Sequence, residues 1–154
     1  MQARRGELVD VLEGGTGLVA EVDEAPVGVI TWLLERGGLS VEIRAVAVDG
    51  ASRGRGIGRA LFEAAHRALA AADAGSSWLV TTNDNVSAIH LYQALGYAVV
   101  EIRRGAIDEI RRTIKPSIPL VGDGGTEMHD ELEMRRPLET YSVTLRRGRR
   151  SQGP

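Results

Sequence analysis

Cysteine is absent from this chain of 154 residues, and lysine occurs once, at Lys115. The lack of thiols excludes disulfide bonds and metal sites built on thiolates. Histidine is also scarce, and the spacing of His66, His90 and His129 is not that of metal ligands, so we expect no metal cofactor. No apolar run has the length of a membrane span, and no signal peptide is recognisable. We therefore expect a cytoplasmic protein without a membrane partner.

The length and net charge of the chain limit which classes of protein remain. A chain of 154 residues is expected to form one domain that buries roughly 70% of its unfolded surface. The net charge of −2 argues against binding to nucleic acid. Arginines cluster at the end, over residues 146–150, and we interpret residues 141–154 as a basic, flexible tail behind a single domain at 1–140. The preference for arginine over lysine is typical of a bacterial genome rich in G and C.

The most informative stretch, residues 46–61, combines an apolar strand, a glycine-rich turn and the start of a helix. Such a turn presents unpaired main-chain N–H groups at the positive end of a helix dipole, which favours an anion. Glycine lacks the Cβ that would keep a phosphate at a distance. Three glycines and three arginines lie in and beside the turn: Gly54, Gly56, Gly58, Arg53, Arg55 and Arg59. We therefore predict a loop that binds a phosphate-bearing ligand.

Two common phosphate-binding loops do not fit this turn. The P-loop requires a lysine after its glycines, and none follows here. The dinucleotide-binding fingerprint requires a third glycine where this chain has Arg59. The pattern Arg53-x-x-Gly56-x-Gly58 instead resembles the Gln/Arg-x-x-Gly-x-Gly/Ala loop of the GNAT acyltransferases. This resemblance implies that the loop binds the pyrophosphate of acetyl-CoA, which would serve as co-substrate.

A second motif extends the resemblance, so that the two together cover roughly residues 40–104. The pattern Asn85-x-x-Ala88-x-x-x-Tyr92-x-x-Leu95-Gly96-Tyr97 is similar to the second GNAT motif. The resemblance implies that Asn85 contacts the pantetheine arm and that Tyr92 is the general acid for the departing thiolate. A core tyrosine with a hydrogen-bonded hydroxyl is the alternative for Tyr92.

The resemblance also implies a full set of donor-binding residues. A main-chain N–H at Ala47 or Val48 would polarise the thioester carbonyl, as an oxyanion donor does. The expected cofactor-binding residues are Ala47, Val48, Arg53, Gly54, Arg55, Gly56, Ile57, Gly58, Arg59, Asn85 and Tyr92.

Transfer to an amine requires a general base, because an alkylamine has a pKa around 10.4 and is charged at neutral pH. Glu42 is the candidate, since strict alternation along the strand places its side chain on the same face as Val46 and Val48. The alternative is a Glu at the rim of a hairpin, paired with an arginine across the strand. Asp130 and Glu131 are rival bases.

The fold class expected is α/β (α+β), with a mixed, largely antiparallel twisted sheet, a central parallel strand pair and flanking helices, as in GNAT domains. The strand–helix–strand order around the loop predicts the parallel pair. Leu61, Leu69, Ala68 and Ala72 are expected on the inner face of the first helix, with His66 and His90 at the surface. The expected strands cover 18–22, 27–34, 40–49, 78–82, 97–102 and 130–136; the expected helices cover 57–73, 86–95 and, as a short piece, 107–112.

The ends of the GNAT-like region depart from the family pattern. Too few residues precede Leu18 for the usual first strand and two helices, and the segment at about 105–129 is longer than the usual turn. We hypothesise that this insert replaces the missing helices as the wall of the acceptor site. A shortened domain can leave apolar sheet surface uncovered, which would favour a homodimer.

The predicted activity is that of an acetyl-CoA-dependent N-acetyltransferase, acting on a primary amine of a small molecule or peptide. The partners would be acetyl-CoA and the amine. The alternative is a non-catalytic module that binds acyl-CoA and regulates another process.

Overall fold

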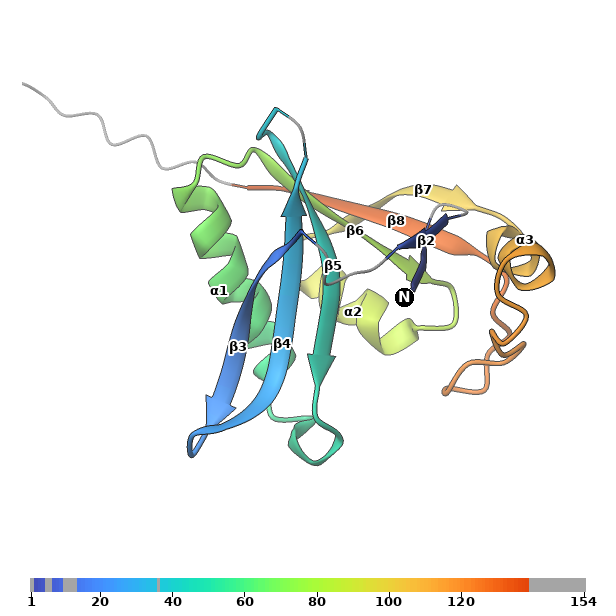
Figure 1. Ribbon diagram of the computed structural model, residues 1–154, viewed down its shortest axis with the longest axis horizontal. Coiled ribbons are helices and arrows are strands. Elements are labelled where there is room, and N and C mark those ends of the chain that lie inside the picture. The colour runs from blue at the N-terminus through green and yellow to red at the C-terminus, as the bar shows by residue number, and fades with distance from the viewer. Residues whose placement is uncertain (1, 5–6, 10–13, 36, 139–154) are drawn as a thin grey trace, which may run out of the picture.

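The computed structural model describes residues 2–4, 7–9, 14–35 and 37–138, so the tail predicted at 141–154 lies outside the described residues. The main sheet has the strand order β3-β4-β5-β6-β8-β7, and β1 pairs with β2 in a separate hairpin (Figure 1). The strands are β1 (Gln2–Arg4), β2 (Glu7–Val9), β3 (Thr16–Val22), β4 (Ala25–Leu34), β5 (Ser40–Val48), β6 (Ser76–Thr82), β7 (Ala98–Arg103) and β8 (Glu131–Pro137). The helices are α1 (Ile57–Ala71), α2 (Val86–Ala94) and α3 (Ala106–Thr113), and a short 3₁₀ turn covers Gly50–Ser52.

The first half of the main sheet is an antiparallel meander. A two-residue turn joins β3 to β4, with Asp23 and Glu24 at φ 50° and 66°. Two consecutive left-handed residues match the right-handed twist of the flanking strands, as in a type I′ hairpin. The strands expected at 18–22 and 27–34 are confirmed and form this hairpin, although β4 begins two residues earlier than expected.

The predicted parallel pair is confirmed as β5 and β6, and it is short. All residues of both strands are described, and among them only Ser40–Glu42 of β5 pair with Ser76–Trp78 of β6. Beyond Glu42 the two strands diverge, and Figure 1 shows β3–β5 and β6–β8 spreading apart toward their ends. The divergence opens a gap in the middle of the sheet, next to the glycine-rich loop.

Helices α1 and α2 pack on one face of the sheet, over a common hydrophobic core. The buried side of α1 comprises Leu61, Phe62, Ala65, His66 and Leu69. From α2, Ile89, Leu91 and Tyr92 pack partly buried against the same core. The predicted inner face was wrong for Ala68 and Ala72, which are exposed, because the buried side of α1 runs through Phe62, Ala65 and Leu69.

His66 is buried, which corrects the expected surface position. Its Nε2 lies 2.8 Å from the hydroxyl of Tyr97, and its Nδ1 lies 2.9 Å from Nη1 of Arg136. Burial, followed by the nearby Arg136 charge, lowers the pKa of His66 to about 4. The imidazole is therefore neutral at pH 7, and Nδ1 accepts a hydrogen bond from the guanidinium. His90 is exposed, as expected.

The sheet ends at β7, an edge strand with several exposed apolar side chains. Val99, Val100 and Ile102 are 38%, 55% and 52% exposed. These residues are compatible with a homodimer, which stays a prediction. Within the described residues, no helix is both long and apolar enough to cross a membrane.

Candidate functional site

The glycine-rich loop joins β5 to α1 and leaves the first turn of the helix without a side-chain cap. Gly56 immediately precedes α1, has φ 79° and makes no capping hydrogen bond. Gly54 is also left-handed, at φ 74°, and a Cβ added at either glycine would meet nothing within 4 Å. The open space above uncapped N–H groups, at the positive end of the helix dipole, suits an anion.

The arginines of the loop point in different directions. Nε of Arg53 donates to the carbonyl of Val48 at 3.3 Å, which holds the side chain beside the end of β5. Arg59 pairs with Glu63 along α1 at 2.9 Å, and both are exposed. Arg53 therefore lies next to the gap between β5 and β6, whereas Arg59 is engaged along α1.

The backbone of β5 presents main-chain groups to this gap. The N–H of Asp49 donates to the carbonyl of Val27 at 2.8 Å, so this residue faces β4. Because directions alternate along a strand, Ala47 also faces β4, whereas Val48 and Val46 face the gap. Of the two predicted donors, the pairing therefore favours the N–H of Val48 over that of Ala47 as the group that could polarise a carbonyl in the gap. The N–H of Val46 faces the same gap and is a further candidate, which sequence reasoning missed.

A β-bulge interrupts β5 near its centre. Ile43 lies opposite Trp32 and Ala45 lies opposite Thr31, so Arg44 is the extra residue of the bulge. An extra residue shifts the alternation of side chains along the strand by one position. Residues before and after the bulge therefore do not follow the simple even–odd pattern of the sequence.

The bulge corrects the predicted orientation of Glu42. Ile43 and Val46 both belong to the core beneath α1, although strict alternation would place them on opposite faces. Glu42 thus lies on the face opposite Val46 and Val48, and the prediction that these three side chains share a face was wrong. Glu42 is 9% exposed, and Arg44 on the same strand donates to its Oε2 at 3.3 Å.

The rival bases have structural contacts of their own. Asp130 Oδ1 accepts the N–H of Gly105, at the start of α3, at 2.9 Å. Glu131 is 1% exposed and accepts from Nη1 of Arg103 at 2.5 Å. Both carboxylates therefore help to connect β7, α3 and β8.

Tyr92 is held on the helix face of the sheet by aromatic packing. Its ring meets Phe62 of α1 edge-on, with centroids 5.5 Å apart, and Tyr97 at 6.2 Å. A Cβ at Gly58 in the first turn of α1 would lie 3.9 Å from Leu91 Cδ2, beside Tyr92, and 3.8 Å from Val48 Cγ2. The loop, the end of β5 and α2 therefore converge at one point.

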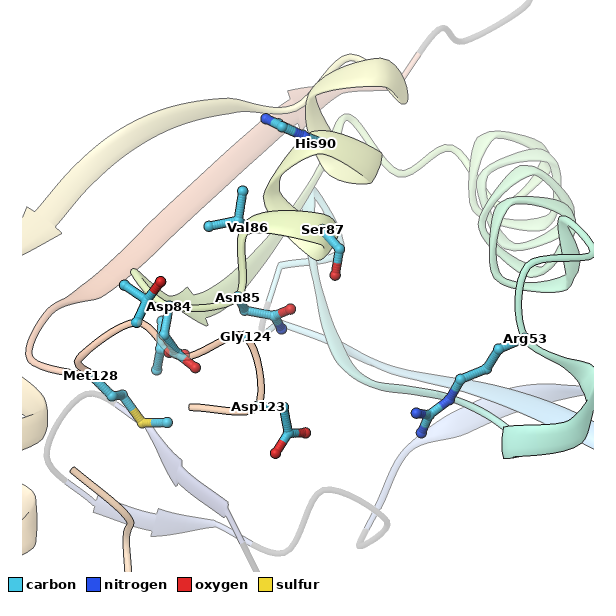
Figure 2. Close-up of a pocket in the computed structure, with 11 residues that line it drawn as sticks. Arg53, Asp84, Asn85, Val86, Ser87, His90, Asp123, Gly124 and Met128 are labelled. Carbon is cyan, nitrogen blue, oxygen red and sulfur yellow. The ribbon is translucent and has the colours of Figure 1, made fainter. Parts of the chain in front are cut away.

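Asn85 precedes α2, is exposed, and makes no capping hydrogen bond with its side chain. It lines a cleft of about 880 Å³ together with Arg53 (Figure 2). The other lining residues are Thr82, Asp84, Val86, Ser87, His90, Asp123, Gly124, Thr126 and Met128. The structure thus brings two predicted donor-binding residues, Arg53 and Asn85, to one cleft. The insert supplies the last four of its lining residues.

Asn83 attaches the insert to the loop between β6 and α2. Its Nδ2 donates to the carbonyl of Glu127 at 2.8 Å, and its Oδ1 accepts the N–H groups of His129 and Asp130, each at 2.9 Å. One amide therefore satisfies three main-chain groups of the segment that enters β8. Sequence reasoning missed this role of Asn83, because its partners lie 44 to 47 residues further on.

Arg111 of α3 holds the rest of the insert together. Its guanidinium donates to the carbonyls of Ile118, Pro119 and Met128 at 3.0, 2.9 and 2.8 Å. It also pairs with Asp108. One side chain thus joins residues 118–119 to residue 128, which gives the insert a defined path beside the cleft.

His129 adds a charged contact within the insert. Its Nδ1 lies 2.9 Å from Asp108 and its Nε2 lies 2.9 Å from Glu127. Hydrogen bonds to Glu127 and then Asp108 raise the pKa of His129, and the bond to His129 lowers the pKa of Asp108. Across the described residues, no group of three His, Asp or Glu side chains has the arrangement of a metal site.

Gly122 allows the insert to approach the β6–α2 loop closely. A Cβ at this position would overlap the carboxylate of Asp84. Asp84 Oδ1 is buried and has no hydrogen-bond partner among the described residues. The carboxylate of Asp84 therefore packs against the insert, beside the cleft that both line.

The sequence matches a model of the acetyltransferase (GNAT) family over residues 3–97. An uncharacterised protein of Bacillus subtilis, YxbD, is 32% identical over 125 residues, which are 81% of this chain and 75% of that protein. YdhI of the same organism, also uncharacterised, is 35% identical over 106 residues, and the match spans 69% of this chain and 63% of YdhI.

Solved structures share the fold. A Bacillus subtilis acetyltransferase in complex with CoA superposes with a TM-score of 0.72 at 22% identity, over 84% of this chain and 80% of that one. A GNAT family acetyltransferase from Elizabethkingia anophelis with acetyl-CoA bound gives a TM-score of 0.71 at 20% identity, over 83% and 79%. At these identities the likeness concerns the fold, including the mixed sheet with its short parallel pair.

Proposed function

The chain belongs to the acetyltransferase (GNAT) family, and from this membership we propose that it transfers the acetyl group of acetyl-CoA to a primary amine of a small molecule or peptide. The transfer is a direct attack within a ternary complex. The observation that carries the proposal is the cleft that Arg53 and Asn85 share, at the mouth of the gap between β5 and β6. This geometry suits a ligand with an anionic end at the loop and an arm that enters the sheet.

The donor is bound mainly by main chain. The pyrophosphate lies over the uncapped first turn of α1, where Gly54 and Gly56 leave space, and Arg53 adds a positive charge. The pantetheine arm follows the gap and contacts Asn85. The N–H of Val48 polarises the thioester carbonyl, and Val46 faces the same gap.

The reaction requires a general acid and a general base. In this proposal the two lie on opposite faces of the sheet. Glu42 is the last residue of β5 paired with β6, on the face away from α1, and it removes the proton from the amine. The nitrogen then attacks the carbonyl carbon, so that the C–N bond forms and the C–S bond breaks. The nitrogen releases its second proton to solvent as it becomes an amide, and solvent returns a proton to the tyrosine that acts as acid. Tyr92, on the helix face, protonates the departing thiolate.

Replacing Glu42 by Gln tests the base. We expect kcat at pH 7 to fall about 100-fold, because proton removal by a positioned group contributes 10² or more. The loss should shrink as the pH rises toward the pKa of the amine, since the amine then loses its proton in solution. A pH profile of thiol release checks this, with the exposed Glu21→Gln on β3 as control. An unchanged kcat at pH 7 would exclude Glu42 as the base.

The insert forms the acceptor side of the cleft in this proposal. Replacing Gly122 by Ala forces either the insert or Asp84 to move, and overpacking of 1–3 kcal/mol corresponds to a loss of about 5- to 150-fold. We expect that loss in kcat/KM for the amine, with the Kd of acetyl-CoA from calorimetry nearly unchanged. Gly50→Ala is the control, since a Cβ there also meets nothing within 4 Å and the residue is outside the lining of the cleft. An equal loss of acetyl-CoA affinity in the Gly122→Ala variant would contradict the assignment.

A further inference from the structure

The apolar layer of the main sheet continues to its edge at β7 but is not covered there. On β8, Leu132 and Met134 are buried, and Met134 belongs to the core beneath the helices. Their partners on β7 are Ile102 and Val99, which share that face because directly opposite residues of an antiparallel pair point to the same side. Ile102 and Val99 are nevertheless 52% and 38% exposed. The layer therefore stops at a strand that leaves apolar surface in contact with water.

The main chain of β7 is open on the same edge. Among the described strands β7 pairs only with β8, and it lies at the rim of the sheet (Figure 1). Edge strands of monomers are usually blunted by charges, proline or a bulge. β7 has a bulge at Val100, but this residue is itself apolar and 55% exposed. The opposite edge strand, β3, has one exposed large apolar side chain, Val19. β7 is thus the edge that a further strand would cover with the larger gain.

The pattern of β7 restricts how a second copy of the same strand could lie beside it. When a two-fold axis perpendicular to the sheet relates two antiparallel strands, one residue lies opposite its own copy. With Glu101 at that position, two carboxylates would face each other. With Val100 there, Val99 would lie opposite Glu101. These two side chains point to opposite faces, because their partners on β8 are the consecutive residues Met134 and Glu133.

The register centred on Ile102 avoids both problems. Ile102 then lies opposite its copy on the helix side, and Glu101 lies opposite Arg103 of the second copy. Glu101 and Arg103 share a face, because their partners Glu133 and Glu131 are two residues apart on β8. The side chain of Glu101 is 53% exposed and already contacts Arg103 of its own chain at 2.8 Å. A second guanidinium can therefore reach the same carboxylate, and the edge is complementary in charge to itself.

We propose that β7 is a homodimer interface, in which two copies pair antiparallel through this strand, centred on Ile102, and form one continuous sheet. The contact is closed, because each copy uses the same edge and none is left for a third. The paired stretch is short, since α3 begins at Ala106. The interface is therefore at the small end of the range for specific complexes, and we expect a Kd of about 1–100 µM.

Sedimentation analysis of the full chain, from about 1 to 500 µM so that the range brackets the expected Kd, tests the interface. The wild-type protein should pass from monomer to dimer. Ile102→Lys removes two apolar contacts and places two ammonium groups opposite each other, so the Kd should rise about 100-fold or more. Val19→Lys is the matched control, because it makes the same kind of change at an exposed residue of the other edge strand. It should leave the Kd unchanged.

Mixing two variants tests the register. Ile102→Glu alone should also be monomeric, because position 102 again faces its own copy with a like charge. An equimolar mixture of Ile102→Lys and Ile102→Glu chains should recover dimers, with a Kd about tenfold or more below that of either variant alone, since opposite charges then meet. Recovery in the mixture supports the proposed pairing, and both substitutions alter an exposed side chain, so folding is preserved.

Four results overturn the proposal. They are a wild-type protein that stays monomeric throughout the range, a dimer that Ile102→Lys does not weaken, variants that do not recover on mixing, and species that grow beyond a dimer with concentration. The last result would indicate that β7 of one copy pairs with β3 of the next, which does not close. None of these measurements requires acetyl-CoA or an amine, so they leave the proposed acetyl transfer untouched.

Discussion

Replacing Tyr92 by Phe lowers kcat by about 100- to 10,000-fold, the range that a positioned general acid contributes, while the Kd of acetyl-CoA changes little. Phenylalanine keeps the ring, and with it the edge-on contacts to Phe62 and Tyr97. The variant therefore loses the hydroxyl without a cavity in the core. Single-turnover measurement of thiol release, together with calorimetric titration of acetyl-CoA, separates the two quantities.

Tyr97→Phe is the matched control for this experiment. The hydroxyl of Tyr97 is buried and bonded to His66 and Ser77, and burial raises its pKa to about 12. Its removal is expected to lower stability by about 1–2 kcal/mol, with kcat nearly unchanged. If Tyr92→Phe behaved in the same way, with lower stability and normal kcat, Tyr92 would be a packing residue.

Replacing Gly56 by Ala is expected to weaken acetyl-CoA binding by about 100-fold. The added Cβ meets no protein atom within 4 Å, so it projects into the space assigned to the pyrophosphate. Loss of two charge-assisted hydrogen bonds at 1.5–3 kcal/mol each is sufficient for an effect of this size. Calorimetric titration with acetyl-CoA measures it.

The substitution also strains the backbone, and Gly105 provides the control for that strain. Both glycines precede a helix in a left-handed conformation, at φ 79° and 68°, with nothing within 4 Å of an added Cβ. Each Ala variant should lose about 1–3 kcal/mol of stability. Only Gly56→Ala should lose affinity for acetyl-CoA. Equal affinity in the two variants would mean that the loop does not bind the pyrophosphate.

Local patterns were sufficient to predict the order of the elements. The turn residues Asp23 and Glu24 separate two apolar runs and so predict a hairpin. The strand–helix–strand order around Gly56 predicts a parallel crossover. These features depend on the chain near each residue, and the structure confirms the hairpin and the parallel pair.

The orientation of Glu42 could not be predicted in the same way. A bulge depends on how β5 pairs with β4, and the sequence around Arg44 alternates as a regular strand would. One extra residue at this position is enough to move Glu42 to the other face. The candidate base thus lies across the sheet from Tyr92, on the face away from α1.

The buried face of α1 and the position of the insert also depend on distant partners. Helix α1 is rich in alanine on several sides, so periodicity alone does not define its inner face, and the partner that keeps His66 buried, Tyr97, is 31 residues away. Asn83 binds main chain 44 to 47 residues further on. No local signal marks such contacts, and the cleft depends on them.

The central claim is that this chain acetylates an amine, and mass spectrometry of the products tests it most directly. The protein is incubated with acetyl-CoA and a panel of primary amines, and the acetylated amine and free thiol are quantified together. The account predicts one N-acetylated amine for each CoA thiol released, with the Tyr92→Phe protein far slower. Tight binding of acetyl-CoA without acetylated product from any amine of the panel would contradict the account and indicate a module that binds acyl-CoA without turnover.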